Sequence, residues 1–186
     1  MITPRFNPPK EWMDSYNQYT YGFCNLMLKL CRMRVKGKAL EIGSYSGDTA
    51  ALMGMFHLFD EIHCVEPFEG EEEFLERNPL DSWWQVEQEF SLNTRYYPVT
   101  LHKGYSYDIL PTLTEKFNFI YIDGAHDYDS VKQDIQLCLP LLAKGGIIAG
   151  HDYQQEHGGV QKAVDELLGK PTHCFEDESW MILTRK

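Results

Sequence analysis

The sequence predicts an α/β domain in which helices cover both faces of a mostly parallel, seven-stranded sheet with an antiparallel C-terminal edge. Short apolar segments alternate with amphipathic helical segments from residue 38 to residue 168, as they do in βαβ units. The segment 117–122 is apolar without alternation, which is typical of a strand buried on both faces. Two short segments, 172–175 and 180–184, then have the pattern of an antiparallel pair. Together these features indicate a Rossmann-like three-layer sandwich.

The individual elements follow in chain order. Pro4, Pro8 and Pro9 favour an extended arm over residues 1–10. Apolar residues at spacings of three and four predict a helix over 11–34, which we expect Gly37 to stop. Strands are expected over 38–42, 61–65, 98–102, 117–122 and 147–149. Helices are expected over 48–59, 128–142 and 160–168, with a short helical turn over 107–113 and a turn at Gly145-Gly146.

We assign the whole chain, residues 1–186, to a single domain whose N-terminal arm and helix occupy residues 1–36. Residues 67–97 interrupt the alternation of strands and helices and are rich in glutamate. We interpret them as a partly helical insertion and as the substrate region, because insertions at strand ends commonly contact ligands. Trp83 and Trp84 can offer an apolar platform to a sugar ring there, or they can pack the insertion onto the core.

The composition restricts the partners that we expect. The formal net charge is −11, so phosphate backbones are repelled and nucleic acid is not an expected partner. The five cysteines include no CxxC pair and are predicted to be reduced, mostly buried thiols. The N-terminal residues MITPRFNPPK lack the apolar core of a signal peptide, and no apolar run reaches the about 18 residues of a membrane-spanning helix. We therefore expect a soluble, cytoplasmic protein with no membrane partner.

A glycine loop, Glu41-Ile-Gly-Ser-Tyr-Ser-Gly47, lies between the first expected strand and the next helix. Glycines let a backbone turn tightly and approach a ligand closely, and the N-terminus of the helix favours an anionic group such as a carboxylate. Glu66 closes the next strand, where an acid can accept both hydroxyl hydrogens of a ribose. Three residues separate Gly43 from Gly47, so the loop does not match GxGxxG and NAD is disfavoured. The alternative is an ordinary glycine-containing turn.

The stretch Ala39-Leu-Glu-Ile-Gly-Ser-Tyr-Ser-Gly47 resembles the first motif of class I S-adenosylmethionine-dependent methyltransferases. The resemblance implies that S-adenosyl-L-methionine is the cofactor and that Gly43 and Tyr45 pass close to its methionine part. Thr49 would bind the carboxylate of the cofactor, and Glu66 would hold its ribose. Glu41, Ser44 and Gly47 complete this part of the site.

A second stretch, Gly104-Tyr-Ser-Tyr-Asp108, resembles the segment that frames the adenine in the same enzymes. The resemblance assigns Gly104, Ser106 and Tyr107 to the cofactor site. The alternative is that Ser106 only caps a helix.

Polar residues also follow two other expected strands. Asp123 and His126 follow the segment 117–122, and His151 and Asp152 follow the segment 147–150. Because carboxyl ends of parallel strands line one crevice, we expect Asp123, His151 and Asp152 to converge as ligands of a divalent cation. His126 can act as a general base in the same cleft. The alternative is that such residues cap helices or bind loop backbone. We expect capping or solvent exposure for three further acids of this region: Asp127, Asp129 and Asp134.

Three motifs follow one another in the order Ile122-Asp-Gly-Ala-His-Asp-Tyr128, Leu141-Leu-Ala-Lys-Gly-Gly146 and Gly150-His-Asp-Tyr153. They resemble motifs of the metal-dependent small-molecule O-methyltransferases, and among these the macrocin and sugar O-methyltransferases above all. The resemblance covers about residues 39–153 without the insertion. It implies that Asp123 binds magnesium beside the cofactor and that His126 is the base. This chain has His151-Asp152 where many relatives have two acids or Asp-Asn.

These features predict an S-adenosylmethionine-dependent O-methyltransferase that acts on a hydroxyl group of a sugar or another small polyhydroxylated molecule. A divalent ion, Mg²⁺ or another, would lower the pKa of that hydroxyl, and His126 would take its proton. The alternatives are a cofactor-binding module without turnover, a metal-dependent hydrolase built on His126, His151 and Asp152, and an NAD-dependent oxidoreductase. The loops carry no readable code for the acceptor. The N-terminal helix can cover the cofactor or pair with a second subunit in a homo-oligomer.

Overall fold

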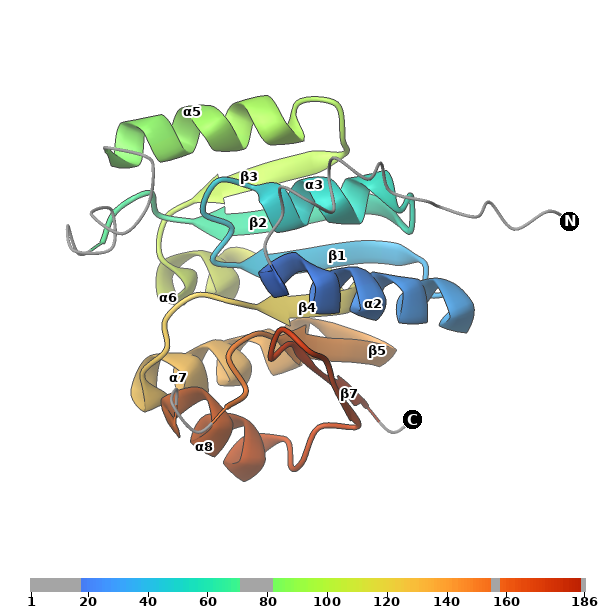
Figure 1. The fold of residues 1–186 in the computed structure, drawn as a ribbon. Helices are drawn as coiled ribbons and strands as arrows, with labels where there is room; N and C mark the ends of the chain where they lie inside the picture. The colour runs from blue at the N-terminus through green and yellow to red at the C-terminus, as the bar shows by residue number, and fades with distance from the viewer. Residues whose placement is uncertain (1–17, 71–81, 155–157, 185–186) are drawn as a thin grey trace, which may run out of the picture.

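The computed structural model describes residues 18–70, 82–154 and 158–184. They form a seven-stranded sheet in the order β3-β2-β1-β4-β5-β7-β6, with helices on both faces (Figure 1). Strands β1 to β5 pair in parallel, whereas β7 pairs antiparallel with both β5 and β6. The predicted three-layer sandwich with an antiparallel C-terminal edge is therefore confirmed.

All seven predicted strands are present. The pairing places β1 at the centre, with Ile42 beside Val65 of β2 on one side and beside Ile122 of β4 on the other. The carboxyl ends of these parallel strands consequently lie at one level, and their loops share one edge of the sheet. The strands are β1 Gly37–Ile42, β2 Phe59–Glu66, β3 Val99–Lys103, β4 Phe117–Ile122, β5 Leu142–Gly150, β6 His173–Cys174 and β7 Trp180–Leu183.

Each face of the sheet has its own apolar core. Helices α2 (Gln18–Met33), α3 (Asp48–Met55) and α5 (Trp83–Thr94) pack on one face. Helices α6 (Ser106–Ile109), α7 (Tyr128–Cys138) and α8 (Gly158–Leu167) pack on the other, with the short 3₁₀ helices η1 (Leu110–Thr112) and η2 (Leu139–Leu141). Burial of these apolar side chains is the main force that holds the layers together.

Helix α2 ends earlier than predicted. Arg34 adopts the left-handed conformation, with φ 60°. The backbone N–H of Arg34 donates to the carbonyl of Cys31 at 3.0 Å, and that of Val35 donates to the carbonyl of Leu30 at 3.1 Å. These two bonds form a Schellman cap, so Arg34 stops the helix and Gly37 opens β1 instead. The predicted start of the helix lies outside the described residues.

Helix α3 is also shorter than its predicted range of 48–59. It ends at Met55 because His57 adopts the left-handed conformation, with φ 50°. Phe59 is therefore the first residue of β2 rather than the last of the helix. A helix and a strand can each direct the apolar side chains of this segment into the core. The apolar pattern alone therefore does not show where the helix ends and the strand begins.

The predicted helix 128–142 is divided. Helix α7 ends at Cys138 because Pro140 lacks the amide hydrogen that an α-helix needs, and the chain continues as η2. Strand β5 starts at Leu142, so the turn predicted at Gly145-Gly146 is wrong. Gly145, with φ 73°, lies inside β5 at an irregularity in its pairing with β4.

The turn between β6 and β7 fixes α2 to the sheet. Asp177 is buried there, and its carboxylate accepts the backbone N–H of Phe23 at 2.6 Å and that of Ser179 at 3.0 Å. The hydroxyl of Ser179 lies 3.1 Å from the hydroxyl of Tyr121 in β4. Gly22 leaves room for this contact, because a Cβ atom at Gly22 would lie 1.8 Å from a carboxylate oxygen of Asp177.

Two predictions from composition concern thiols and membrane spans. All five cysteines are free, as predicted, but the prediction that most of them are buried is wrong. Cys64 and Cys138 are buried, Cys24 and Cys31 are half-buried, and Cys174 is exposed. Within the described ranges, no helix has the length and apolar character needed to cross a membrane.

The Asp177 contact predicts a loss of stability on mutation. Asp177→Ala removes two hydrogen bonds to a charged acceptor, which should lower the free energy of unfolding by about 2 kcal/mol. Urea denaturation measures this change. Glu176→Ala is the matched control, because Glu176 is exposed and accepts one bond from Asn25 at 3.3 Å; it should change stability by less than about 0.5 kcal/mol. Equal effects of the two substitutions would contradict the role of Asp177.

Candidate functional site

The residues that follow the parallel strands are held by backbone hydrogen bonds to the neighbouring strand. Each of these N–H groups extends the pairing of the sheet by one step beyond the last strand residue. The site residues therefore begin at fixed positions rather than in free loops. The bonds are Gly43 N–H to Val65 O (3.0 Å), Gly104 N–H to Glu66 O (3.1 Å), Asp123 N–H to Ile42 O (2.8 Å) and His151 N–H to Ile122 O (3.1 Å).

The glycine loop follows β1 and contains three residues with positive φ. Gly43 has φ 80°, Tyr45 has φ 43° and Gly47 has φ 78°, and Gly47 is the N-cap of α3. Side chains are also excluded by space, since a Cβ atom at Gly43 would lie 2.1 Å from the backbone oxygen of Asp123. The two glycines are thus required by the conformation of the loop and by its close approach to β4.

Glu66 braces this loop from the end of β2. Its side chain is 6% exposed; one carboxylate oxygen accepts the N–H of Tyr45 at 2.8 Å and the other accepts the N–H of Phe68 at 3.0 Å. Burial raises the pKa of Glu66, and these N–H groups partly offset the shift. Each oxygen has two lone pairs, so the carboxylate can still accept two hydroxyl hydrogens. The position thus fits the predicted ribose contact, whereas the bracing of the loop was not predicted.

Glu41 lies in β1 and is completely buried. Burial raises its pKa to about 7, an effect that the neighbouring hydroxyls of Thr49 and Ser44 oppose. The thiol of Cys64 points at the same carboxylate at 3.6 Å. Glu41 therefore lies close to Ser44 of the glycine loop and to Thr49 at the start of α3.

The segment Gly104–Asp108 was predicted to frame adenine or to cap a helix. Tyr105 holds the N-cap position of α6, so capping by Ser106 is wrong. The Ser106 hydroxyl instead donates to the carboxylate of Asp134 at 2.5 Å. The rings of Tyr105 and Tyr107 stack on each other at 5.2 Å and are both exposed.

Among the three acids expected to cap or face solvent, Asp134 differs from the prediction. Asp127 is the N-cap of α7 and accepts the N–H of Ser130 at 3.0 Å, and Asp129 is exposed. Asp134 is only 5% exposed. A signal for this burial was present, because Asp134 falls between Val131 and Cys138 in the inward-facing stripe of α7.

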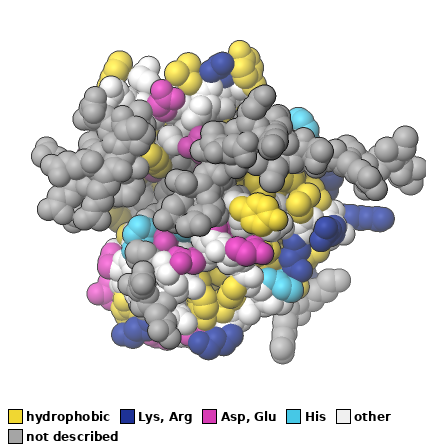
Figure 2. All heavy atoms as spheres, viewed as in Figure 1, with side chains coloured by type: hydrophobic (Ala, Val, Ile, Leu, Met, Phe, Trp, Pro, Cys, Tyr) yellow, Lys and Arg dark blue, Asp and Glu magenta, His cyan; other side chains and the backbone are white. Residues whose placement is uncertain are grey.

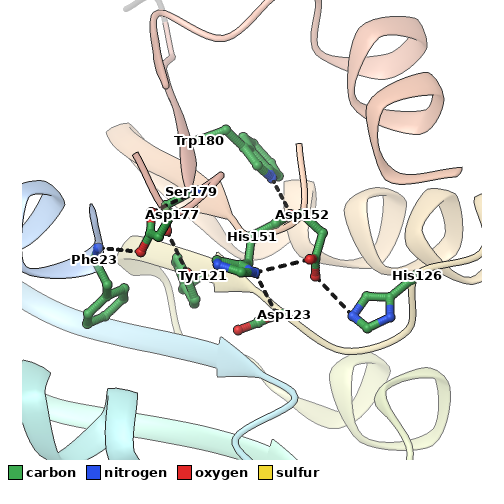
Figure 3. A network of polar contacts seen from close by, with 9 residues as sticks. All are labelled: Phe23, Tyr121, Asp123, His126, His151, Asp152, Asp177, Ser179 and Trp180. Carbon is green, nitrogen blue, oxygen red and sulfur yellow. Dashed lines mark hydrogen bonds and ion pairs between the residues drawn. The ribbon is translucent and has the colours of Figure 1, made fainter. Parts of the chain in front are cut away.

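Acids and histidines converge beyond the ends of β4 and β5 (Figure 3). Ligand atoms of Asp123, His126 and Asp152 lie within 4.8 Å of one another. His126 Nε2 lies 3.0 Å from one carboxylate oxygen of Asp152, while His151 Nδ1 lies 3.3 Å from the other. His151 Nδ1 also lies 3.9 Å from Asp123. Two carboxylates with imidazole nitrogens suit a divalent cation such as Mg²⁺ or a first-row transition metal.

The backbone aims Asp152 and His151 into this cluster. Asp152 adopts the left-handed conformation, with φ 59°, which few residues other than glycine, asparagine and aspartate tolerate. The Trp180 indole N–H donates to the carbonyl of His151 at 3.1 Å and anchors the segment to β7. A small pocket lined in part by Asp123, His126 and Trp180 opens at this point.

The charges of the cluster are strongly coupled. Burial raises the pKa of Asp123 to about 6, although His151 acts against this shift. Burial also opposes ionisation of Asp152, but hydrogen bonds from His126 and His151 hold its pKa well below the usual range. The bond to Asp152 raises the pKa of His126. Burial disfavours protonation of His151, yet Asp152 and Asp123 outweigh it and raise the pKa to about 9.

The cluster is accessible at the surface. Figure 2 shows acidic and histidine side chains side by side at the left of the molecule, on the side where the loops follow the parallel strands in Figure 1. The side chain of His126 is 44% exposed, whereas those of His151 and Asp152 are 15% and 12% exposed. His126 is thus the most exposed member of the cluster.

Helix α5 of the predicted insertion contacts the glycine loop. The Asn93 side chain donates to the backbone oxygen of Ser46 at 3.0 Å and to Asp48 at 3.2 Å. Trp83 packs against the core with its ring 6.3 Å from that of Tyr45, whereas Trp84 is 67% exposed. Packing onto the core is therefore the arrangement of Trp83. Residues 71–81 and the arm over residues 1–10 lie outside the described residues.

The strand order with an antiparallel β7, together with the glycine loop after β1, defines a class I methyltransferase fold. Residues 40–153 match the family model of a methyltransferase domain. That match covers more than half of the chain, which therefore belongs to this methyltransferase family.

A curated relative is the uncharacterised protein R132 of Acanthamoeba polyphaga mimivirus. It is 31% identical over 138 residues, which make up 69% of this chain and 58% of that protein. The chain thus spans less than two thirds of the length of this relative.

Solved structures share the fold at low sequence identity. CalS11, a TDP-rhamnose 3′-O-methyltransferase of calicheamicin biosynthesis, is 17% identical, with a TM-score of 0.62 over 97% of this chain and 88% of that chain. The O-methyltransferase NovP is 17% identical, with a TM-score of 0.65 over 87% and 77%. TomG from Streptomyces achromogenes, solved with S-adenosylmethionine, is 17% identical, with a TM-score of 0.59 over 98% and 93%.

The raised pKa of Glu41 predicts a pH-dependent gain in stability on mutation. The folded-state pKa of about 7 lies above the unfolded value of about 4.3. Ionisation therefore costs stability as the pH rises from about 4.3 to 7, and the cost persists above pH 7. Glu41→Gln removes it and should stabilise the protein by up to about 4 kcal/mol at pH 8, with little effect at pH 4.

Urea denaturation at both pH values measures the effect of Glu41→Gln. Glu61→Gln is the control, because Glu61 is exposed and its hydrogen bond with Lys38 lowers the pKa of its carboxyl group. The control should give no gain at pH 8. A Glu41→Gln variant no more stable than the wild type at pH 8 would rule out a buried charge at this position.

Proposed function

We propose that this protein is an S-adenosylmethionine-dependent O-methyltransferase that acts on a hydroxyl group of a sugar or another small polyhydroxylated molecule, with help from a divalent cation. One observation carries the proposal. The glycine loop lies next to the acid–histidine cluster, which consists of Asp123, His126, His151 and Asp152. A Cβ atom at Gly43 would lie 2.1 Å from the backbone oxygen of Asp123. A methyl donor over the loop and a hydroxyl group at the cluster would therefore be neighbours, which is what methyl transfer requires.

The loop residues supply the cofactor contacts in this proposal. Gly43 and Tyr45 would run beside the methionine part, and the N–H groups of the first turn of α3, near Thr49, would face its carboxylate. Glu66 accepts the ribose hydroxyl hydrogens with its remaining lone pairs. When bound, S-adenosylmethionine supplies a methyl group on a sulfonium, whose sulfur needs no protonation to leave.

The cluster residues prepare the acceptor. Asp123 and Asp152, with His151, would hold the cation, which when bound would supply a Lewis acid that lowers the pKa of a hydroxyl group. His126, the exposed member, would accept the proton that this hydroxyl group loses. Asp152 holds the His126 ring at 3.0 Å and stabilises the imidazolium that results, since an adjacent carboxylate favours the charged form.

Methyl transfer with and without chelator tests the role of the cation. Incubation with S-adenosylmethionine and a panel of sugar and catechol acceptors should give a methylated hydroxyl group, detected by mass spectrometry. EDTA should lower the rate at least about tenfold, and added Mg²⁺ should restore it. Full activity in EDTA would remove the cation from the proposal. Cofactor binding without transfer to any acceptor would favour a binding module, and hydrolysis of a phosphate or ester without cofactor would favour a hydrolase.

A histidine substitution tests the base. His126→Asn keeps a hydrogen-bond donor near Asp152 but removes the group that takes the proton, so turnover should fall about 100-fold or more. The affinity for S-adenosylhomocysteine, measured by calorimetry, should change less than about threefold. His57→Asn is the control, because His57 is exposed and its left-handed backbone suits asparagine. Turnover by His126→Asn equal to that of the control would exclude His126 as the base.

A further inference from the structure

Asp134 is a buried carboxyl group that the proposed chemistry does not use. It lies on the inner face of α7 with 5% of its surface exposed. The hydroxyl of Ser106, the first residue of α6, donates to its Oδ1 atom at 2.5 Å. Within the described part of the chain, this is the hydrogen bond that holds the carboxyl group. A buried acid with a single hydroxyl partner is costly, which indicates a role beyond packing.

The Ser106–Asp134 pair borders the cofactor crevice. A Cβ atom at Gly124, the residue after Asp123, would lie 3.6 Å from Asp134 Oδ2 and 3.6 Å from the side chain of Ile42. Gly124 therefore lies against both the carboxyl group and the end of β1. Gly104, two residues before Ser106, donates its N–H to the carbonyl of Glu66 at 3.1 Å, so Ser106 follows β3 at the same edge of the sheet as the glycine loop. Ile42 is the last residue of β1, immediately before the glycine loop. The pair therefore stands on the wall of the crevice on the α7 side.

The pair fixes the direction of one hydroxyl proton. A serine hydroxyl has one hydrogen to donate and two lone pairs to accept. While the hydrogen points at the Asp134 carboxylate, Ser106 can only accept a hydrogen bond from a ligand. Adenine presents the donor N6–H₂ on its edge, whereas hypoxanthine presents an oxygen there. An acceptor that faces another acceptor is left unpaired, and such a mismatch is the strongest basis for rejecting an analogue.

We propose that Asp134 is a positioning residue that sets Ser106 as the acceptor for the exocyclic amino group of the cofactor's adenine. The proposal rests on the proposed function, in which Glu66 holds the ribose of the same nucleoside. It assigns adenine selectivity to a residue on α7 that need not touch the base.

The selectivity should depend on pH. Burial raises the pKa of Asp134 to about 6, with Asp127 adding to the shift and the Ser106 hydroxyl opposing it. Burial is the larger cause of the raised pKa of the Cys138 thiol, one turn further along α7, and the charge of Asp134 adds to that shift. Above pH 6 the carboxylate accepts from Ser106. Below pH 6 the protonated group can donate to Ser106, whose own hydrogen is then free to meet an oxygen of hypoxanthine.

Binding calorimetry with S-adenosylhomocysteine and S-inosylhomocysteine tests the proposal. At pH 8 the wild type should bind the adenosyl compound about tenfold or more tightly than the inosyl compound. This is the ratio of affinities that one hydrogen bond near a charged group contributes. Asp134→Ala and Ser106→Ala should each reduce this ratio to less than about threefold. Asp129→Ala, an exposed acid on the same helix, should keep it. Because the readout is a ratio of two affinities, effects that weaken the binding of both compounds equally cancel. Two alanine variants, Asp134→Ala and Ser106→Ala, keep the test valid if one of them fails to fold.

A conservative variant separates positioning from packing. Asp134→Asn keeps an oxygen that can accept the Ser106 hydrogen, so discrimination should persist at pH 8 and should no longer fall between pH 8 and pH 5. The wild-type ratio should fall over the same range. If the wild type binds S-adenosylhomocysteine and both alanine variants keep full discrimination, Asp134 has no such role and the proposed function stands. If the wild type binds neither compound, the proposed function fails and this inference fails with it.

Discussion

Backbone N–H groups immediately after the parallel strands donate to the neighbouring strand, and this extended ladder fixes the level of the site. Gly43 is tied to β2, Asp123 to β1 and His151 to β4. Because β1 pairs in parallel with both β2 and β4, the glycine loop and the acid–histidine cluster start at the same edge. A one-residue slip of any strand would turn every side chain of that strand to the opposite face, and the two halves of the site would no longer adjoin.

The types and order of the helices and strands could be predicted from local sequence patterns. The residues at which some of these elements begin and end could not. The unbroken apolar run of β4 and the antiparallel pair at the C-terminus were readable because strand patterns need only a few neighbouring residues. The end of α2 depends on a left-handed Arg34 and the place of Gly145 depends on its pairing with β4. The prediction relied on glycines at both places. The cap at Arg34 is local but uses a residue other than glycine, and the position of Gly145 depends on a tertiary contact.

In the candidate site, the position of the polar residues could likewise be predicted from the sequence, whereas the contacts that hold them could not. Asp123, His126, His151 and Asp152 were predicted to meet because strand ends share one edge, and they lie close together. The contacts that hold the site involve partners distant in sequence: Glu66 with the N–H of Tyr45, Ser106 with Asp134, and Asp177 with Phe23. Sequence spacing carries no information on such pairs. The inward stripe of α7 did carry a signal for the burial of Asp134, which the prediction of capping or solvent exposure missed.

The hydrogen bond from the glycine loop to Glu66 affects the entropic cost of binding a ligand. Tyr45 is held in a left-handed conformation by the Glu66 carboxyl group, so a contact within the protein itself supports the shape of the loop. Ordering a flexible loop costs about 1 to 2 kcal/mol of conformational entropy for each residue, and a loop that is already rigid avoids this loss at the moment of association. The same carboxylate thus acts twice, once on the chain itself and once towards the ribose that we propose it binds. Recognition at this edge of the sheet would then require little rearrangement of the loop.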